Sequence, residues 1–216
     1  MSLDARLAVL TTNPGREERQ IFAALDRRGI PYVQIDERVH RLGSPRVPHY
    51  RAVLNRTRNP HAAALFEATG HRVFNPSAVV ETCGNRILTT VALVRAGVPT
   101  PETVVTLAED VAAIEQESVE GREIRVLVIG GTAVATVPLT GELEWLAQHA
   151  AEAVGGGMLA VDIVERSSGE LLVTKIDHAL EFDDLAEAAG VDIADLIVDH
   201  VDRNSPPIEW VRDQAA

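Results

Sequence analysis

The chain has 216 residues, of which 46% are hydrophobic and 24% are charged. This composition is ordinary for a globular protein and excludes disordered and collagen-like classes. No apolar run is long enough for a bilayer, and the first residues lack the basic and apolar regions of a signal peptide. The single cysteine, Cys83, excludes a disulfide framework. We expect a cytoplasmic protein with one α/β domain or two small docked ones.

Charge is divided unevenly along the sequence. The net charge is -12, yet residues 1–100 hold 14 basic and 8 acidic side chains, whereas residues 101–216 hold 6 and 24. Such a division can fasten the halves together, pair chains head to tail, offer a basic face to an acidic partner, or be plain solvated charge. Because the basic half has no Lys/Arg run and few aromatics, we do not expect nucleic acid as a partner. The lack of a long apolar run predicts no membrane partner. Lys175 is the only lysine beside 19 arginines.

The first hundred residues alternate strand and helix patterns. Apolar runs bounded by turn residues predict strands at 6–10, 32–35, 52–54 and 72–74. Helical spacing of apolar residues predicts helices at 17–28, 60–68, 76–81 and 85–96. Since strands that alternate with helices are typical of βαβ units, the pattern predicts a parallel sheet.

The second half begins after the segment AGVPTPET, where two prolines exclude a helix interior or a central strand. We place a domain junction there, which gives domains 1–100 and 101–216. Helices are then predicted at 108–115, 140–154 and 192–201, and strands at 124–129, 133–137, 158–164 and 170–176. Gly130-Gly131 indicates a hairpin. The glycines at 155–157 are interpreted as a helix end, because no Lys-Ser/Thr follows them as in a phosphate loop.

Two carboxylates, Asp162 and Asp177, are predicted to meet across the last hairpin, with Lys175 on the same face. Carboxylate oxygens are ligands that Mg²⁺ prefers, so the pair is a candidate magnesium site. The ammonium of Lys175 would occupy the place of the cation and form a structural ion pair instead. The residues alone favour the ion pair.

The order of motifs resembles the RimK/LysX-type ATP-grasp ligases, which include lysine-biosynthesis enzymes that join α-aminoadipate to an amino-group carrier protein. The resemblance rests on RLAVL, VLNRT, VFNPSAVVETCGNRILTTVALVRAGVPTPET, EQESVEGREIRVLVIGGTAV and AAEAVGGGMLAVDIVE, in that order along the chain. It implies an α/β fold, with an N-terminal parallel-sheet pre-ATP-grasp domain followed by an ATP-grasp domain that is shortened here. It also implies ATP and Mg²⁺ as cofactors, and joining of a carboxylate to an amine through an acyl phosphate.

The resemblance also assigns roles to residues of this sequence. It implies contacts to the nucleotide from Arg86, Gln116, Glu117 and Val119, a catalytic role for Arg125, and metal binding by Asp162 and Asp177.

The sequence departs from the family pattern in its second half. Lys175 stands where the family has a metal-ligating Glu, and Asp177 where it has Asn. The stretch between Thr103 and Glu115 is too short for the family's lysine-bearing strand and glycine-rich loop, and the acceptor-side segment before Thr140 is missing.

These departures leave three hypotheses. The leading one is a catalytically impaired ATP-grasp homologue that acts as a binding or regulatory partner of an acidic carrier protein or an active paralogue, as a homo-oligomer. The second is a minimised, active ATP-dependent ligase that joins an amino acid to a carrier protein or peptide. The third is a decayed gene remnant or an internal deletion.

Overall fold

The computed structural model describes residues 3–38, 49–108, 111–136 and 139–206. Their contacts form two compact units. The first unit consists of residues 1–80, 181–183 and 192–216, and the second of residues 81–180 and 184–191. By its contacts, the C-terminal segment from residue 192 therefore belongs to the first unit. The predicted domains 1–100 and 101–216 are divided by sequence resemblance and not by contacts, and this division stays a prediction.

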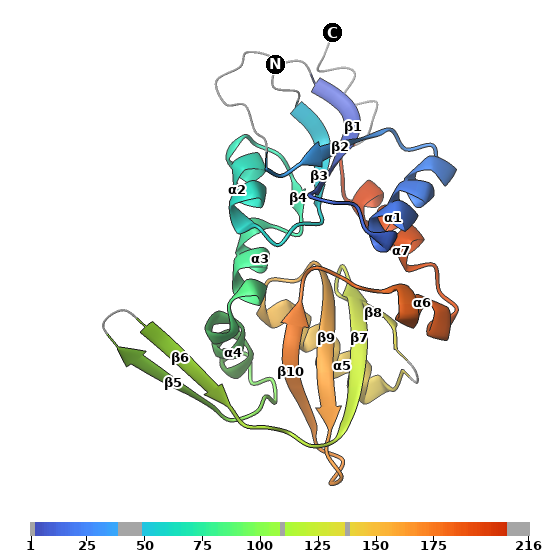
Figure 1. Ribbon diagram of the computed structural model, residues 1–216. Helices are drawn as coiled ribbons and strands as arrows, with labels where there is room; N and C mark the ends of the chain where they lie inside the picture. The colour runs from blue at the N-terminus through green and yellow to red at the C-terminus, as the bar shows by residue number, and fades with distance from the viewer. Residues whose placement is uncertain (1–2, 39–48, 109–110, 137–138, 207–216) are drawn as a thin grey trace. The chain divides into compact units, whose positions relative to one another are not determined.

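A parallel sheet forms the centre of the first unit (Figure 1). Its strands are β1 (Leu3–Thr11), β2 (Tyr32–Asp36), β3 (His49–Asn55) and β4 (Val73–Phe74), in the order β2-β1-β3-β4. All recorded pairs in this sheet are parallel, which confirms the prediction from alternating strands and helices. Consecutive residues 7–10 of β1 are almost fully buried, because helices cover both faces of the sheet.

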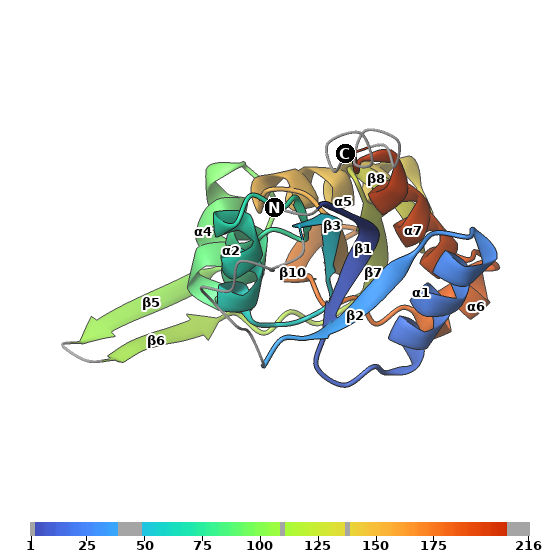
Figure 2. The same ribbon diagram turned by 90° about the horizontal axis from the view of Figure 1, so that it is seen from above.

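Three helices accompany this sheet. The apolar face of α2 (Pro60–Ala68) packs in a core cluster with β1, β3 and β4. Asn59 caps α2, since its side chain accepts the N–H of His61. The helices α1 (Arg16–Arg27) and α7 (Ile193–Arg203) contact each other and lie side by side in Figures 1 and 2. Each buries an apolar stripe at helical spacing, which is why both form here.

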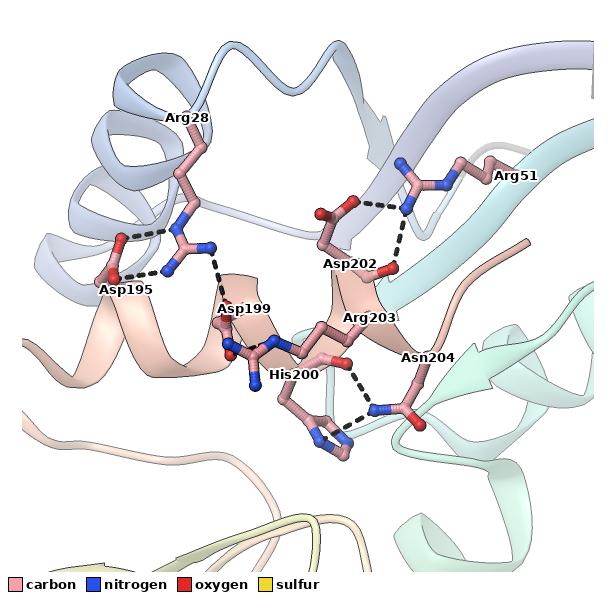
Figure 3. A network of polar contacts seen from close by, with 8 residues as sticks. All are labelled: Arg28, Arg51, Asp195, Asp199, His200, Asp202, Arg203 and Asn204. Carbon is pink, nitrogen blue, oxygen red and sulfur yellow. Dashed lines mark hydrogen bonds and ion pairs between the residues drawn. The ribbon is translucent and has the colours of Figure 1, made fainter. Parts of the chain in front are cut away.

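Ion pairs join the acidic helix α7 to basic residues of the first half (Figure 3). Arg28 donates two hydrogen bonds to Asp195, at 2.7 and 2.6 Å, and one to Asp199 at 2.9 Å. Arg51 of β3 donates to the side chain of Asp202 and to its carbonyl, the latter at 2.9 Å. The uneven charge along the sequence therefore joins basic residues of the first half to the acidic helix α7 within this unit.

An antiparallel sheet forms the centre of the second unit. Its strands are β7 (Arg122–Ile129), β8 (Thr132–Ala135), β9 (Met158–Glu165) and β10 (Leu171–Asp177), in the order β10-β9-β7-β8. The predicted Gly130-Gly131 turn joins β7 to β8, and both glycines have positive φ. Helix α5 (Gly141–Ala153) contacts all four strands. It ends before the glycines at 155–157, which confirms their interpretation as a helix end.

The helices α3 (Ser77–Gly84) and α4 (Arg86–Arg95) match the predicted pair, and Asn85 caps α4. Helix α6 (Asp183–Ala189) has no fully buried residue and was not predicted. The predicted strand at 133–137 is observed to Ala135, and Val137 lies outside the described residues. No helix in the described ranges is long and apolar enough to cross a membrane.

The prediction of a helix at 108–115 is wrong. The segment belongs to a hairpin of β5 (Thr103–Ala108) and β6 (Val111–Gln116), which forms a separate two-stranded sheet (Figure 2). The register runs from Thr103 opposite Gln116 to Ala108 opposite Val111. The helix-favouring alanines of β6 are thus overridden by pairing with a β-branched partner strand.

Candidate functional site

A cavity of about 240 Å³ lies within the second unit, beside α4 and β10. Its polar lining includes Arg86, Gln116, Lys175, Thr89, Thr90 and Thr174. Two of these side chains are cationic, and none of the described residues that line the cavity is acidic. The lining therefore suits an anionic ligand. The volume is below the roughly 300–1,000 Å³ typical of a whole small-molecule site, so it fits part of a ligand.

The start of α4 positions the first cation. Because Asn85 ends the extended chain and accepts the N–H groups of Ile87 and Leu88, Arg86 is the first residue of the helix. Its guanidinium donates to the side-chain oxygen of Gln116, at the end of β6. The Gln116 amide in turn donates to the hydroxyl of Thr103 at 3.4 Å. The structure thus brings Arg86 and Gln116, both predicted nucleotide contacts, to one cavity.

The second cation comes from the antiparallel sheet. In the strand register, Asp162 of β9 lies opposite Arg125 of β7 on one side and Lys175 of β10 on the other. Arg125 donates to both oxygens of Asp162, with nitrogen to oxygen distances of 2.7 and 3.0 Å. Nζ of Lys175 donates to Asp177 at 3.2 Å. The second oxygen of Asp177 accepts the N–H of Ala179 at 2.9 Å.

These contacts do not suit a magnesium site. Mg²⁺ requires several oxygen ligands in near-octahedral geometry. Both oxygens of Asp162 are taken by a guanidinium, and Asp177 is taken by an ammonium and a backbone N–H. Across the described ranges, no three His, Cys, Asp or Glu residues are grouped as metal ligands. The donor set therefore fits ion pairs, the alternative that the residues alone favour.

Other predicted site residues do not reach the cavity. Glu117, Val119, Arg125, Asp162 and Asp177 are absent from its lining. The backbone N–H of Glu117 donates to the carbonyl of Glu102 at 2.9 Å, and its carboxylate accepts from Arg166 at 2.6 Å. Val119 is partly buried in the connection between β6 and β7. The backbone N–H and the carboxylate of Glu117 are thus engaged within the chain, and the predicted nucleotide contacts of Glu117 and Val119 stay predictions.

The sequence did not predict the threonines or Cys83 as part of the site. Burial, and then the charge of Asp177, raises the pKa of the Cys83 thiol to about 12. A thiol with this pKa is protonated at neutral pH and is not a nucleophile. Threonine at helical and strand positions carries no sequence signal for a site. Lys175 did carry one, as the only lysine of the chain.

Comparison with known proteins finds similarities in sequence and in fold. Residues 7–82 match the LysX preATP-grasp domain. The glutamate–LysW ligase ArgX of Sulfolobus acidocaldarius is 21% identical over 283 aligned positions, which cover 92% of this chain and 99% of the relative.

Solved structures show the same similarity over both units. The RimK domain ATP-grasp protein of Sphaerobacter thermophilus superposes with a TM-score of 0.76 at 24% identity, covering 91% of this chain and 99% of that chain. The ATP-grasp ligase PsnB, in complex with a precursor variant, Mg and ADP, gives a TM-score of 0.74 at 15% identity, with coverage of 92% and 98%. The fold is therefore that of the ATP-grasp proteins.

Residues 7–82 thus resemble the LysX preATP-grasp domain, and the chain as a whole resembles the ArgX ligase in sequence and the RimK-type ATP-grasp proteins in fold. The parallel-sheet first part and the shortened ATP-grasp part agree with the resemblance found in the sequence. The 283 aligned positions with ArgX exceed the 216 residues of this chain. Internal segments of that relative consequently have no counterpart here.

Proposed function

We propose that this chain is a catalytically impaired ATP-grasp homologue that acts as a binding or regulatory protein. The observation that carries the proposal is the engagement of both candidate metal carboxylates by cations of the chain itself. Asp162 is held by Arg125, and Asp177 by Lys175. The same side chains cannot hold Mg²⁺ without losing these ion pairs.

Charge balance explains why the impairment follows. Phosphoryl transfer depends on fixed cations and metal ions around the developing negative charge. Loss of one such stabilising contact costs about 3 kcal/mol of transition-state stabilisation. This chain lacks a lysine between residues 103 and 116, where a two-stranded hairpin lies, and its metal carboxylates are neutralised. Several losses of this size together lower the rate of phosphoryl transfer below detection.

A protein partner is supported by an exposed apolar face of α4. Leu88, Val91 and Val94 follow one another at three-residue spacing on α4 and are 40%, 47% and 61% exposed. Exposed apolar side chains grouped on one helix face are typical of protein interfaces. The proposed partner is an acidic carrier protein or an active paralogue, and the name of the ArgX relative includes the carrier LysW. We also propose that the chain forms a homo-oligomer.

The second candidate is a minimised active ligase that joins an amino acid to a carrier protein or peptide, with ATP and Mg²⁺. The specific observation in its favour is that Arg86 and Gln116, two predicted nucleotide contacts, lie at one cavity. Another chain in an oligomer would then have to supply the missing lysine and metal ligands.

A ligation assay separates the two candidates. The purified chain is incubated with ATP, Mg²⁺, glutamate and a LysW-type carrier, and the carrier mass and the release of ADP are measured. We expect no mass increase and ADP release equal to that of a sample without protein, while an active ArgX-type ligase in parallel modifies the carrier. Turnover that disappears in Arg86→Gln, and persists in a variant of the exposed Arg122, would establish the ligase instead. Size-exclusion chromatography with light scattering tests both the homo-oligomer and a stable complex with the carrier.

A further inference from the structure

The cavity beside α4 and β10 has positive charge without a metal. Arg86 and Lys175 both line it. The hydroxyl protons of Thr89, Thr100 and Thr174 are donated to backbone carbonyls at 2.7, 2.9 and 3.2 Å. Favourable contacts to an anion must therefore come chiefly from the two cations.

Both cations have hydrogen-bonding capacity left for a ligand. An ammonium has three N–H donors and a guanidinium five. For the described residues, the recorded acceptor of Lys175 is Asp177, and that of Arg86 is Gln116. The Lys175 side chain is 58% exposed, so a ligand can reach it, whereas Asp177 beneath it is 11% exposed. The aspartate thus anchors the ammonium and leaves its outer side open.

The strand register places Lys175 where a cation is needed. It lies opposite Asp162 and two residues before Asp177, between the two carboxylates that were expected to hold Mg²⁺. The ammonium of Lys175 neutralises Asp177, while Arg125 holds Asp162, and the ammonium offers its remaining protons to an anion. It can therefore provide the charge screening that a metal provides between carboxylates and phosphates.

We propose that the cavity binds the phosphate groups of a nucleoside diphosphate or triphosphate without a divalent cation, with Lys175 in place of the metal and Arg86 as the second cation. The inference deepens the proposed function, because it assigns a ligand class to a site that binds without turnover. Added Mg²⁺ competes with Lys175 for the phosphate oxygens, so it does not strengthen binding. This behaviour is the opposite of that of a magnesium-dependent site.

Calorimetric titration of ADP into the full chain tests the inference, once with EDTA and once with excess Mg²⁺. We expect binding in EDTA that is unchanged or weaker in Mg²⁺. Binding seen only with Mg²⁺, strengthened tenfold or more by it, or absent in both conditions overturns the inference. Inorganic pyrophosphate in a parallel titration shows whether the phosphates alone suffice. Pyrophosphate that binds as tightly as ADP would overturn a nucleotide as the ligand.

Charge variants give the second arm. Lys175→Glu replaces the ammonium by a carboxylate, and we expect at least a tenfold loss of ADP affinity in EDTA and partial recovery with Mg²⁺. Arg122→Gln is the matched control, because it removes an exposed arginine of the same unit that pairs with Glu165 at 2.6 Å, outside the cavity. Circular dichroism confirms that each variant is folded, and Lys175→Gln provides a neutral alternative if the glutamate variant does not fold. Equal affinity of the Lys175 variants and the control would overturn the role of Lys175.

The ligation assay and this titration fail independently. Turnover of ATP would refute the proposed loss of catalysis whatever the titration shows. Absence of ADP binding in both buffers would refute metal-free phosphate binding and leave a non-catalytic protein partner intact.

Discussion

Arg51→Met replaces a buried charge that joins β3 to the C-terminal end of α7 (Figure 3). The Arg51 side chain is 3% exposed. It donates to the carbonyl of Pro206 at 2.7 Å, to the carbonyl of Asp202 at 2.9 Å and to the Asp202 carboxylate. Methionine keeps an unbranched apolar stem but leaves the acceptors without a donor.

The expected cost follows from these contacts. Hydrogen bonds that involve a charged group contribute about 1.5–3 kcal/mol each. The carboxylate of Asp202 is 37% exposed and can regain water, and Nη1 of Arg51 has no acceptor among the described residues. We therefore expect a net loss of about 2–3 kcal/mol in the free energy of unfolding of the first unit, below the 3–5 kcal/mol of a fully buried pair.

Native-state hydrogen exchange measures this loss for each unit separately. Since 1.4 kcal/mol corresponds to a factor of ten, amides of β1 and β3 should exchange roughly 30- to 150-fold faster, while those of β9 stay unchanged. In the control Arg122→Met, which breaks an exposed pair, the change should stay within about 0.5 kcal/mol. A loss below that value in Arg51→Met, or an equal loss in β9, would refute the assignment of α7 to the first unit.

Three further predictions concern pH, packing and reactivity. Hydrogen bonds from Arg28 hold the pKa of Asp195 below its usual range. The contribution of this pair to stability is therefore complete above the unfolded pKa of about 3.9 and is lost as the pH falls through the folded pKa. Below pH about 3.9, the melting temperature of Arg28→Gln should depend less on pH than that of the unchanged chain. Gly121→Ala would place a Cβ 2.2 Å from the carbonyl oxygen of Glu165, so we expect destabilisation of about 1–3 kcal/mol in urea unfolding, and a variant as stable as the unchanged chain would contradict this close approach. Because burial raises the pKa of Cys83 to about 12, a thiol-specific disulfide reagent should label it at pH about 8 only after guanidinium chloride is added.

Local signals predicted most elements of the fold. Asn59, Asn85 and Thr140 start helices as side-chain caps, and the Gly130-Gly131 turn joins two strands, because each depends on a few neighbouring residues. The helix predicted at 108–115 failed for the opposite reason. Its state is decided by pairing with β5, which local propensity does not include.

Contacts between residues far apart in the sequence could not be predicted from it. The sequence shows that the second half is acidic, but not that α7 pairs with Arg28 and Arg51 of the first. At the site, the motif order predicted nucleotide contacts from Arg86 and Gln116, and both residues line one cavity, while their role stays a prediction. Whether Asp162 and Asp177 hold a metal or an ion pair depends on which side chains face them, and Arg125 reaches Asp162 only through the strand register.

A single-turnover assay tests the central claim of lost catalysis most directly. The chain is held in excess over radiolabelled ATP, with Mg²⁺, glutamate and a LysW-type carrier present, and ADP is followed over time. Formation of an acyl phosphate releases one ADP for each ATP consumed, whether or not ligation is completed. The account predicts release at the rate of a sample without protein. Conversion of most of the ATP within minutes would contradict it.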